Sequence, residues 1–97
     1  MANIRGLKKD IDFLVSQVVI DCFQYINHFE KADKKTAYKI IEDVLGLRSE
    51  LRKRANHPDG KDNPALVKKH FSAIGKDLLK GCDKAYEKLG KLVEKGE

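Results

Sequence analysis

The feature that most constrains this 97-residue chain is a long helical repeat of apolar or small residues within residues 64–93. Successive members are three or four positions apart, which is the spacing of side chains on one face of an α-helix. They are Val67, Phe71, Ile74, Leu78, Cys82, Ala85, Leu89 and Leu92. At about 1.5 Å per residue, such a helix is about 45 Å long. Because an isolated helix is only marginally stable in water, the rest of the chain must cover this stripe.

A first helix is predicted to begin between Ile4 and Leu7 and to end near Phe29. Its apolar residues also recur at helical spacing, so one face is expected to lie in the core. That face holds Ile4, Leu7, Ile11, Leu14 or Val15, Val18, Cys22, Tyr25, Ile26 and Phe29. A second helix has the same pattern. Its predicted core face holds Ala37, Ile40, Ile41, Val44, Leu47, Leu51 and Ala55.

The connections between these helices fix their directions. Residues 30–33 allow only a tight turn, so the first two helices must run antiparallel. Asp33 is the predicted N-cap of the second helix, and Pro58 is predicted to end it, with a turn at residues 58–60. Asn63 followed by Pro64 predicts the start of the third helix, because Asn is a favoured N-cap and proline fits the first helical position.

We therefore predict an all-α fold, an antiparallel up-down-up three-helix bundle with a long C-terminal helix and loops near residues 30–34 and 57–63. Residues 1–97 form a single domain, because a chain of this length has room for one core. Gly75 and Gly81 flank the third stripe, which predicts close approach of a neighbouring helix. Cys22 and Cys82 are expected at similar heights, as buried free thiols.

The composition indicates which class of protein this is and in which compartment we expect it. Hydrophobic residues make up 41% of the chain and charged residues 36%, which is outside the range of disordered chains. The most apolar run, residues 13–23, is too short and too polar to span a bilayer, and no signal-peptide pattern opens the chain. With two cysteines and no disulfide framework, we expect a cytoplasmic protein that does not enter membranes.

The sequence contains no recognisable motif of a metal-binding, phosphate-binding or catalytic site. His28, His57 and His70 fall at opposite ends of the expected bundle, and residues 59–63 do not match a calcium-binding loop. No phosphate-binding loop or nucleophile elbow occurs. We therefore expect no enzyme activity, no cofactor, no metal site and no small-molecule substrate.

Five large apolar residues lie outside the predicted core faces: Phe13, Ile20, Phe23, Tyr38 and Leu45. We call this set the outer strip. Neighbouring helices could cover it as the flank of a wide core, or it could be an exposed surface that meets another subunit or a protein partner. The second interpretation predicts a protein-interaction or self-association module, with a homodimer as its simplest form.

The alternative function is binding of nucleic acid or another anion. The chain carries a net charge of +5, and antiparallel packing brings Arg5, Lys8 and Lys9 to the same end as the 57–63 loop. The candidate binding residues there are Arg52, Lys53, Arg54, Lys61, Lys68 and Lys69. The N-terminus of the third helix also points to this end and favours an anion. No aromatic residue is interleaved for base stacking, which places this function second.

Four segments carry a resemblance to a known family: residues 4–11 (IRGLKKDI), Leu47-Arg48 with Leu51, residues 57–61 (HPDGK) and residues 79–83 (LKGCD). In these the chain resembles a family of short, uncharacterised all-helical bacterial proteins, over most of its length. The resemblance implies an all-helical fold. It implies no activity, so it assigns no functional residue.

Overall fold

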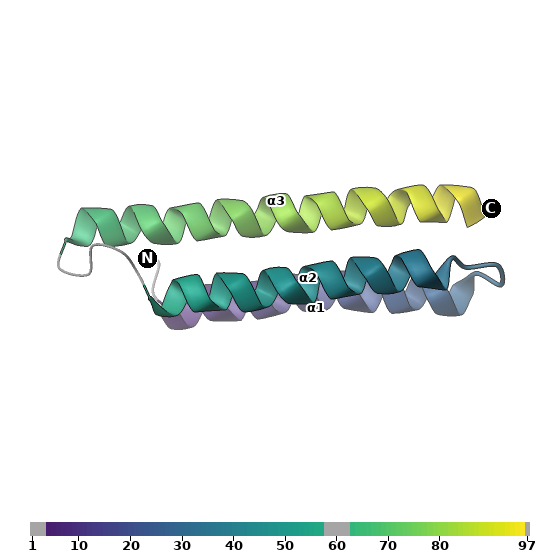
Figure 1. The fold of residues 1–97 in the computed structure, drawn as a ribbon, viewed down its shortest axis with the longest axis horizontal. Helices are drawn as coiled ribbons and strands as arrows, with labels where there is room; N and C mark the ends of the chain where they lie inside the picture. Colours follow the sequence, from purple (N-terminus) through teal and green to yellow (C-terminus); the bar gives the residue numbers. More distant parts are fainter. Residues whose placement is uncertain (1–3, 58–62, 97) are drawn as a thin grey trace.

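The computed structural model describes residues 4–57 and 63–96, and these form three helices. Helix α1 spans Ile4–His28, α2 spans Lys34–Asn56 and α3 spans Pro64–Gly96 (Figure 1). No strand occurs in the described part of the chain. The predicted all-α three-helix bundle with a long C-terminal helix is confirmed.

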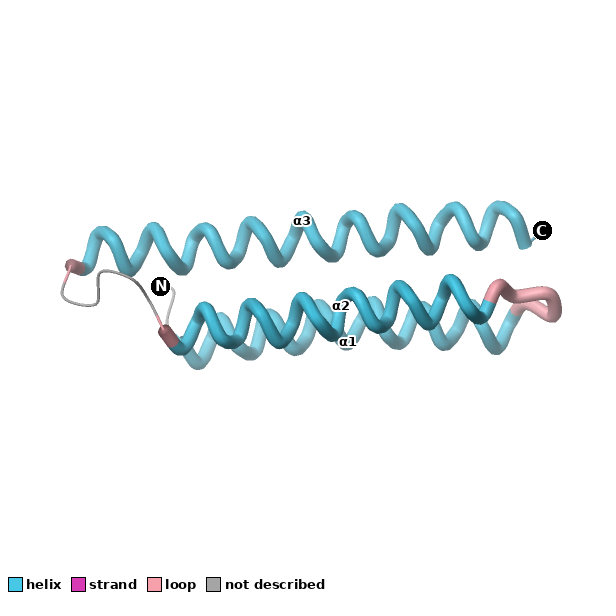
Figure 2. Tube along the Cα trace, viewed as in Figure 1, coloured by secondary structure: helices cyan, strands magenta, loops and turns pink. Residues whose placement is uncertain are grey.

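The three helices lie along one another in an elongated bundle 54 Å long. A short turn joins α1 to the antiparallel α2 (Figure 2). Helix α3 then runs back along both and extends beyond the end of the α1–α2 pair at its own N-terminus (Figure 1). Pro64, Ala65 and Leu66, the first residues of α3, are exposed.

The core consists of apolar residues from all three helices, and no polar or charged residue is buried among the described residues. The predicted α3 stripe is buried throughout, except that Val67 is half-buried. On α2 the predicted face is also buried, with Leu47 half-buried. On α1 the fully buried positions are Ile11, Val15, Val18, Cys22 and Tyr25. Burial of each large aliphatic side chain contributes about 1.5–3 kcal/mol, so the helices are held mainly by this shared core.

Both predicted N-caps are present. Thr36 donates its backbone N–H and its hydroxyl to the two carboxylate oxygens of Asp33, at 3.1 and 2.6 Å. Asn63 Oδ1 accepts the backbone N–H of Ala65 at 3.0 Å, and α3 begins at Pro64 as predicted. These caps satisfy amides that have no partner within their helices.

The two glycines that flank the α3 stripe differ. A Cβ at Gly81 would clash with Leu47 Cδ2, so α2 and α3 approach closely there as predicted. The same prediction is wrong for Gly75, where an added Cβ would meet nothing within 4 Å. The side of α3 that carries Gly75 borders a surface hollow, so the missing side chain leaves space.

Two predictions depend on residues outside those described: the turn at residues 58–60 and the position of Lys61. Across residues 4–57 and 63–96, none of the helices combines the length and apolar character that a segment crossing a bilayer needs.

Candidate functional site

The outer strip is exposed in the monomer. The exposed fraction of its side chains runs from 45% at Phe23 to 63% at Phe13. Neighbouring helices therefore leave these residues open, and the interpretation of the strip as a covered flank of the core does not hold. Scattered exposed apolar residues are ordinary in monomers. These five residues indicate an interaction surface only if they lie together on the molecule.

On α1 six of the exposed residues follow a regular seam. Its positions are Lys9, Phe13, Ser16, Ile20, Phe23 and Asn27, and all six side chains are exposed. We call them the α1 seam. Their spacing alternates between three and four residues, the heptad spacing by which one helix packs along another. Helix α1 thus carries large apolar residues on two faces, one buried in the bundle and one open.

An ion-pair cluster sets the register between α1 and α2. Asp12 accepts hydrogen bonds from Arg48 Nε at 2.8 Å and from Arg52 Nη1 at 2.7 Å. Asp12 of α1 is therefore level with the middle of this arginine pair on α2. Counting along the antiparallel helices from there places Phe23 near the height of Tyr38. Tyr38 and Leu45 precede Arg52 at intervals of seven residues, so they lie on the same side of α2 as the arginine that contacts α1, and the strip continues from α1 onto α2.

These arginines also change the acidity of Asp12. Partial burial raises the pKa of Asp12, but the hydrogen bonds and positive charges of Arg48 and Arg52 outweigh it and hold the pKa below its ordinary value of 3.8. Asp12 is therefore ionised at neutral pH and links α1 to α2.

On its other side, α1 borders a hollow of about 500 Å³ against α3. Phe13 and Leu14 line it from α1, and Gly75 and Leu79 line it from α3. Leu79 is 58% exposed, so this hollow adds a further apolar residue beside the outer strip. Leu79 was not predicted from the sequence. The signal was present, because Leu79 and Tyr86 are one heptad apart beside the α3 stripe, as Tyr38 and Leu45 are on α2.

Farther along the same groove, Tyr86 of α3 donates its hydroxyl to Asp21 of α1 at 2.8 Å. Burial and the Asp21 carboxylate raise the pKa of Tyr86 to about 12. This hydrogen bond joins α1 to α3. The hollow beside it, about 370 Å³, is lined by aromatic and aliphatic side chains together with Gln24 and His28.

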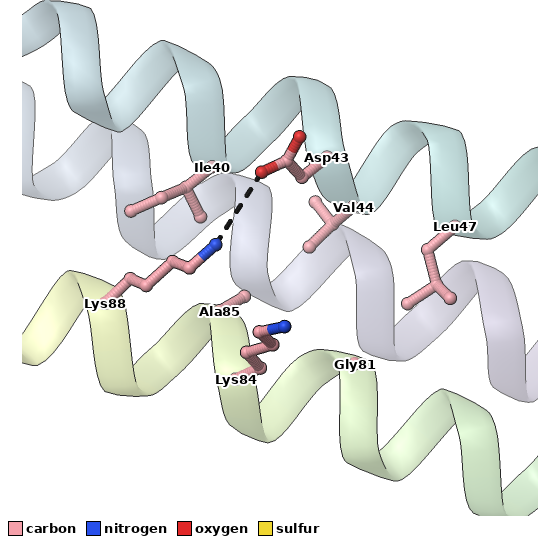
Figure 3. Close-up of a pocket in the computed structure, with 8 residues that line it drawn as sticks. All are labelled: Ile40, Asp43, Val44, Leu47, Gly81, Lys84, Ala85 and Lys88. Carbon is pink, nitrogen blue, oxygen red and sulfur yellow. Dashed lines mark ion pairs between the residues drawn. The ribbon is translucent and has the colours of Figure 1, made fainter.

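The groove between α2 and α3 is smaller, about 240 Å³ (Figure 3). Ile40, Val44 and Ala85 line it, and Lys88 Nζ reaches Asp43 across it at 3.9 Å. Lys84 adds a second cation to the lining. This combination of one long ion pair and aliphatic side chains offers no nucleophile with an adjacent base.

The structure separates the candidate anion-binding residues. Arg52 pairs with Asp12, and Arg54 Nη1 binds Asp77 Oδ2 at 2.7 Å, so both arginines hold helices together. The Asn63 side chain already accepts first-turn amides of α3, which reduces what that helix end offers an anion. The backbone carbonyl of Arg54, near the end of α2, also accepts a hydrogen bond from His70 Nε2 of α3 at 2.7 Å. This hydrogen bond is a further link between the two helices.

Lys53, Lys68 and Lys69 are exposed and have no ion-pair partner among the described residues. Lys68 and Lys69 line a shallow hollow of about 430 Å³ on α3 together with Lys76, which was not among the residues predicted from the sequence. Lys61 is outside the described residues. Only part of the predicted basic cluster is therefore free to meet an anion.

Cys22 and Cys82 are buried free thiols, as predicted. Burial raises the pKa of both. Among the residues that the structure describes, no group of three or more His, Cys, Asp or Glu side chains is placed to hold a metal ion.

Comparison of the chain with known protein families, with curated proteins and with solved structures gives no match. The family resemblance noted from the sequence therefore stays a prediction.

Proposed function

We propose that this protein is a non-enzymatic interaction module that packs its outer strip against a helical surface of another protein molecule. The observation that carries the proposal is the exposure of all five residues, Phe13, Ile20, Phe23, Tyr38 and Leu45, on two adjacent helices of one monomer. Apolar residues grouped on one face commonly mark a protein–protein contact.

Other features of the bundle support the proposal that the outer strip contacts another protein molecule. The same helices bury a complete core on their inner faces, so the fold does not need the outer strip for its own stability. The strip contains two phenylalanines and a tyrosine, and aromatic residues are enriched at interfaces. Buried free thiols at Cys22 and Cys82 support a reducing, cytoplasmic setting.

Hydroxyl-radical footprinting tests the proposal without requiring the partner to be known. The full chain is labelled in intact cells and, separately, as dilute purified protein. We expect Phe13, Phe23 and Tyr38 to be labelled several-fold less in cells, because a partner covers them there. Leu66 serves as an internal control, since it is exposed on the extending end of α3, away from the strip.

Equal labelling of Phe13, Phe23 and Tyr38 in cells and in dilute solution would overturn the proposal. A loss of labelling that includes Leu66 to the same degree would also count against it. That pattern reflects general shielding rather than contact through the outer strip.

A second candidate function is anion or nucleic-acid binding at the basic end. The observation that favours it is the shared hollow of Lys68, Lys69 and Lys76, three lysines on one side of α3. Phosphates attract such a cluster, and contacts of this kind weaken steeply as salt rises. The engagement of Arg52 and Arg54 by Asp12 and Asp77 keeps this function second.

Titration against DNA and RNA at two salt concentrations tests this second function. Binding should fall steeply with salt and be lost in the double variant Lys68→Glu with Lys69→Glu. The matched control is Lys39→Glu, an exposed lysine on α2. Absence of binding at low salt would remove this function.

A further inference from the structure

We infer that the partner of the outer strip is a second copy of this chain, with the two α1 helices packed antiparallel about a two-fold axis level with Val18. The inference rests on the proposed function and deepens it by naming the partner and the register. A two-fold axis brings the same surface of both copies together, so that surface must be complementary to its own reversed copy.

The α1 seam meets this requirement, because its positions are symmetric about Val18. Antiparallel pairing at this register places Phe13 opposite the partner's Phe23 and Ser16 opposite the partner's Ile20. Lys9 then lies opposite the partner's Asn27. Each contact occurs twice, so the two large aromatic pairs lie on either side of the centre. The small Ser16 leaves room beside the branched Ile20, which allows close packing at the middle.

The same two-fold axis also brings the exposed surfaces of the two α2 helices together. Because Asp12 is level with the middle of the Arg48–Arg52 pair, Val18 is level with Val44. An axis crossing both helices at that height passes next to Leu45. The exposed Leu45 side chains of the two copies are thereby brought near each other, and the interface joins α1 and α2 of one copy to α1 and α2 of the other.

Charge favours the antiparallel direction over the parallel one. Arg5 and Lys9 are exposed near the N-terminus of α1, and Glu30 is exposed just beyond its C-terminus. Antiparallel pairing brings these cations to the negative end of the partner's α1 dipole and to the partner's Glu30, beside which Lys31 is also exposed. Parallel pairing would place Lys9 against the partner's Lys9, and like charges in contact are unfavourable.

Disulfide trapping with single-cysteine substitutions tests the register. Lys9→Cys and Asn27→Cys each replace an exposed polar residue of the α1 seam and leave its apolar residues intact. In the inferred dimer, position 9 of one copy faces position 27 of the other. The two copies of position 9 are about 27 Å apart along the helix axis, at about 1.5 Å per residue. A disulfide needs Cα atoms within about 7 Å, so only the mixed pair can close.

The two variants, one carrying a mass tag, are mixed as folded full-length chains and treated with diamide. This oxidant takes two electrons and two protons from each thiol pair. The mixed disulfide should form at least about tenfold faster than either homodisulfide. Ala73→Cys, exposed on α3, gives the background rate of random collision, and the buried Cys22 and Cys82 remain as an unchanged pair in every variant. Thermal unfolding of each variant by circular dichroism confirms that it is folded.

Faster formation of the Lys9→Cys homodisulfide would show parallel pairing and overturn the inference while leaving the proposed function standing. Dimers by sedimentation with cross-linking no faster than the Ala73→Cys background would place the contact on another face, which also overturns the inference. A chain that sediments only as a monomer rejects the second copy as partner. In that case footprinting in cells separately decides whether a different protein covers the outer strip.

Discussion

Leu47 of α2 lies directly over Gly81 of α3, so closely that a Cβ at position 81 would clash with the Leu47 side chain. At this contact α2 and α3 approach closely because Gly81 has no side chain. Leu47 is only half-buried, and its methyl groups fill the space that Gly81 leaves.

Gly81→Ala should therefore gain less than the stability that alanine normally brings to a helix. Gly46→Ala is the matched control, because Gly46 is exposed on α2 and an added Cβ meets nothing within 4 Å. The control should raise the free energy of unfolding by about 1 kcal/mol. The clashing atom is a methyl group of a half-buried side chain, so Leu47 must turn aside, and Gly81→Ala should gain less stability than Gly46→Ala. Urea unfolding of both variants measures the difference, and an equal gain at the two sites would show that the contact has no energetic role.

Most of the fold could be predicted because it depends on local patterns. The helical spacing of apolar residues located all three core faces, and Asp33 and Asn63 located two helix starts. Gly75 shows where this reasoning fails. A glycine beside a stripe indicates a close approach only if a neighbouring helix lies on that side, which depends on how the helices pack around one another and not on spacing within one of them.

The link between α1 and α2 at Asp12 should depend on pH. Its pKa is lowered in the folded state, so its contribution to stability is present above the ordinary value of 3.8 and is lost as pH falls through the lowered value. Asp12→Asn should reduce the free energy of unfolding by about 0.5–1 kcal/mol at neutral pH, the upper range for partly exposed pairs. Chemical unfolding from pH 7 downward should show this difference shrinking in acid.

Asp43→Asn is the control for this prediction, because the ion pairs that Asp43 makes within the described helices are longer, at 3.4 Å with Lys39 and 3.9 Å with Lys88. Its effect at neutral pH should be smaller than that of Asp12→Asn. Equal effects of the two variants would mean that the double arginine contact adds nothing.

The Tyr86 hydroxyl should lose its proton at a higher pH than an ordinary tyrosine. Its pKa is raised to about 12 by burial and by the hydrogen bond to Asp21. Its contribution to stability is therefore complete below the ordinary value of 10.0 and is lost as pH rises through about 12. The difference in tyrosinate absorbance between the wild type and Tyr86→Phe isolates this group. In an Asp21→Asn background the same difference titration should move toward 10.0, and an unchanged midpoint would show that burial alone sets it.

The outer strip could be found from the sequence, but its exposure could not. Phe13, Ile20 and Phe23 break the core periodicity of the first helix, which marks them as unusual. Whether a neighbour covers them depends on how α2 and α3 pack around α1, and that is a property of the whole bundle. The ion pairs of Arg52 and Arg54 were missed for the same reason, since Asp12 and Asp77 are far from them in sequence.

Sedimentation equilibrium of the wild type and Phe13→Asp tests self-association through the outer strip. Phe13 is exposed, so the charge should leave the monomer folded while disrupting an apolar contact with the partner. The control is Leu66→Asp, an exposed apolar position on α3 outside the strip. Self-association through the outer strip requires that the wild type and Leu66→Asp approach twice the chain mass of 11.0 kDa as concentration rises, while Phe13→Asp stays at the mass of one chain. A wild type that stays at 11.0 kDa throughout, or a Phe13→Asp variant that associates equally well, would contradict it.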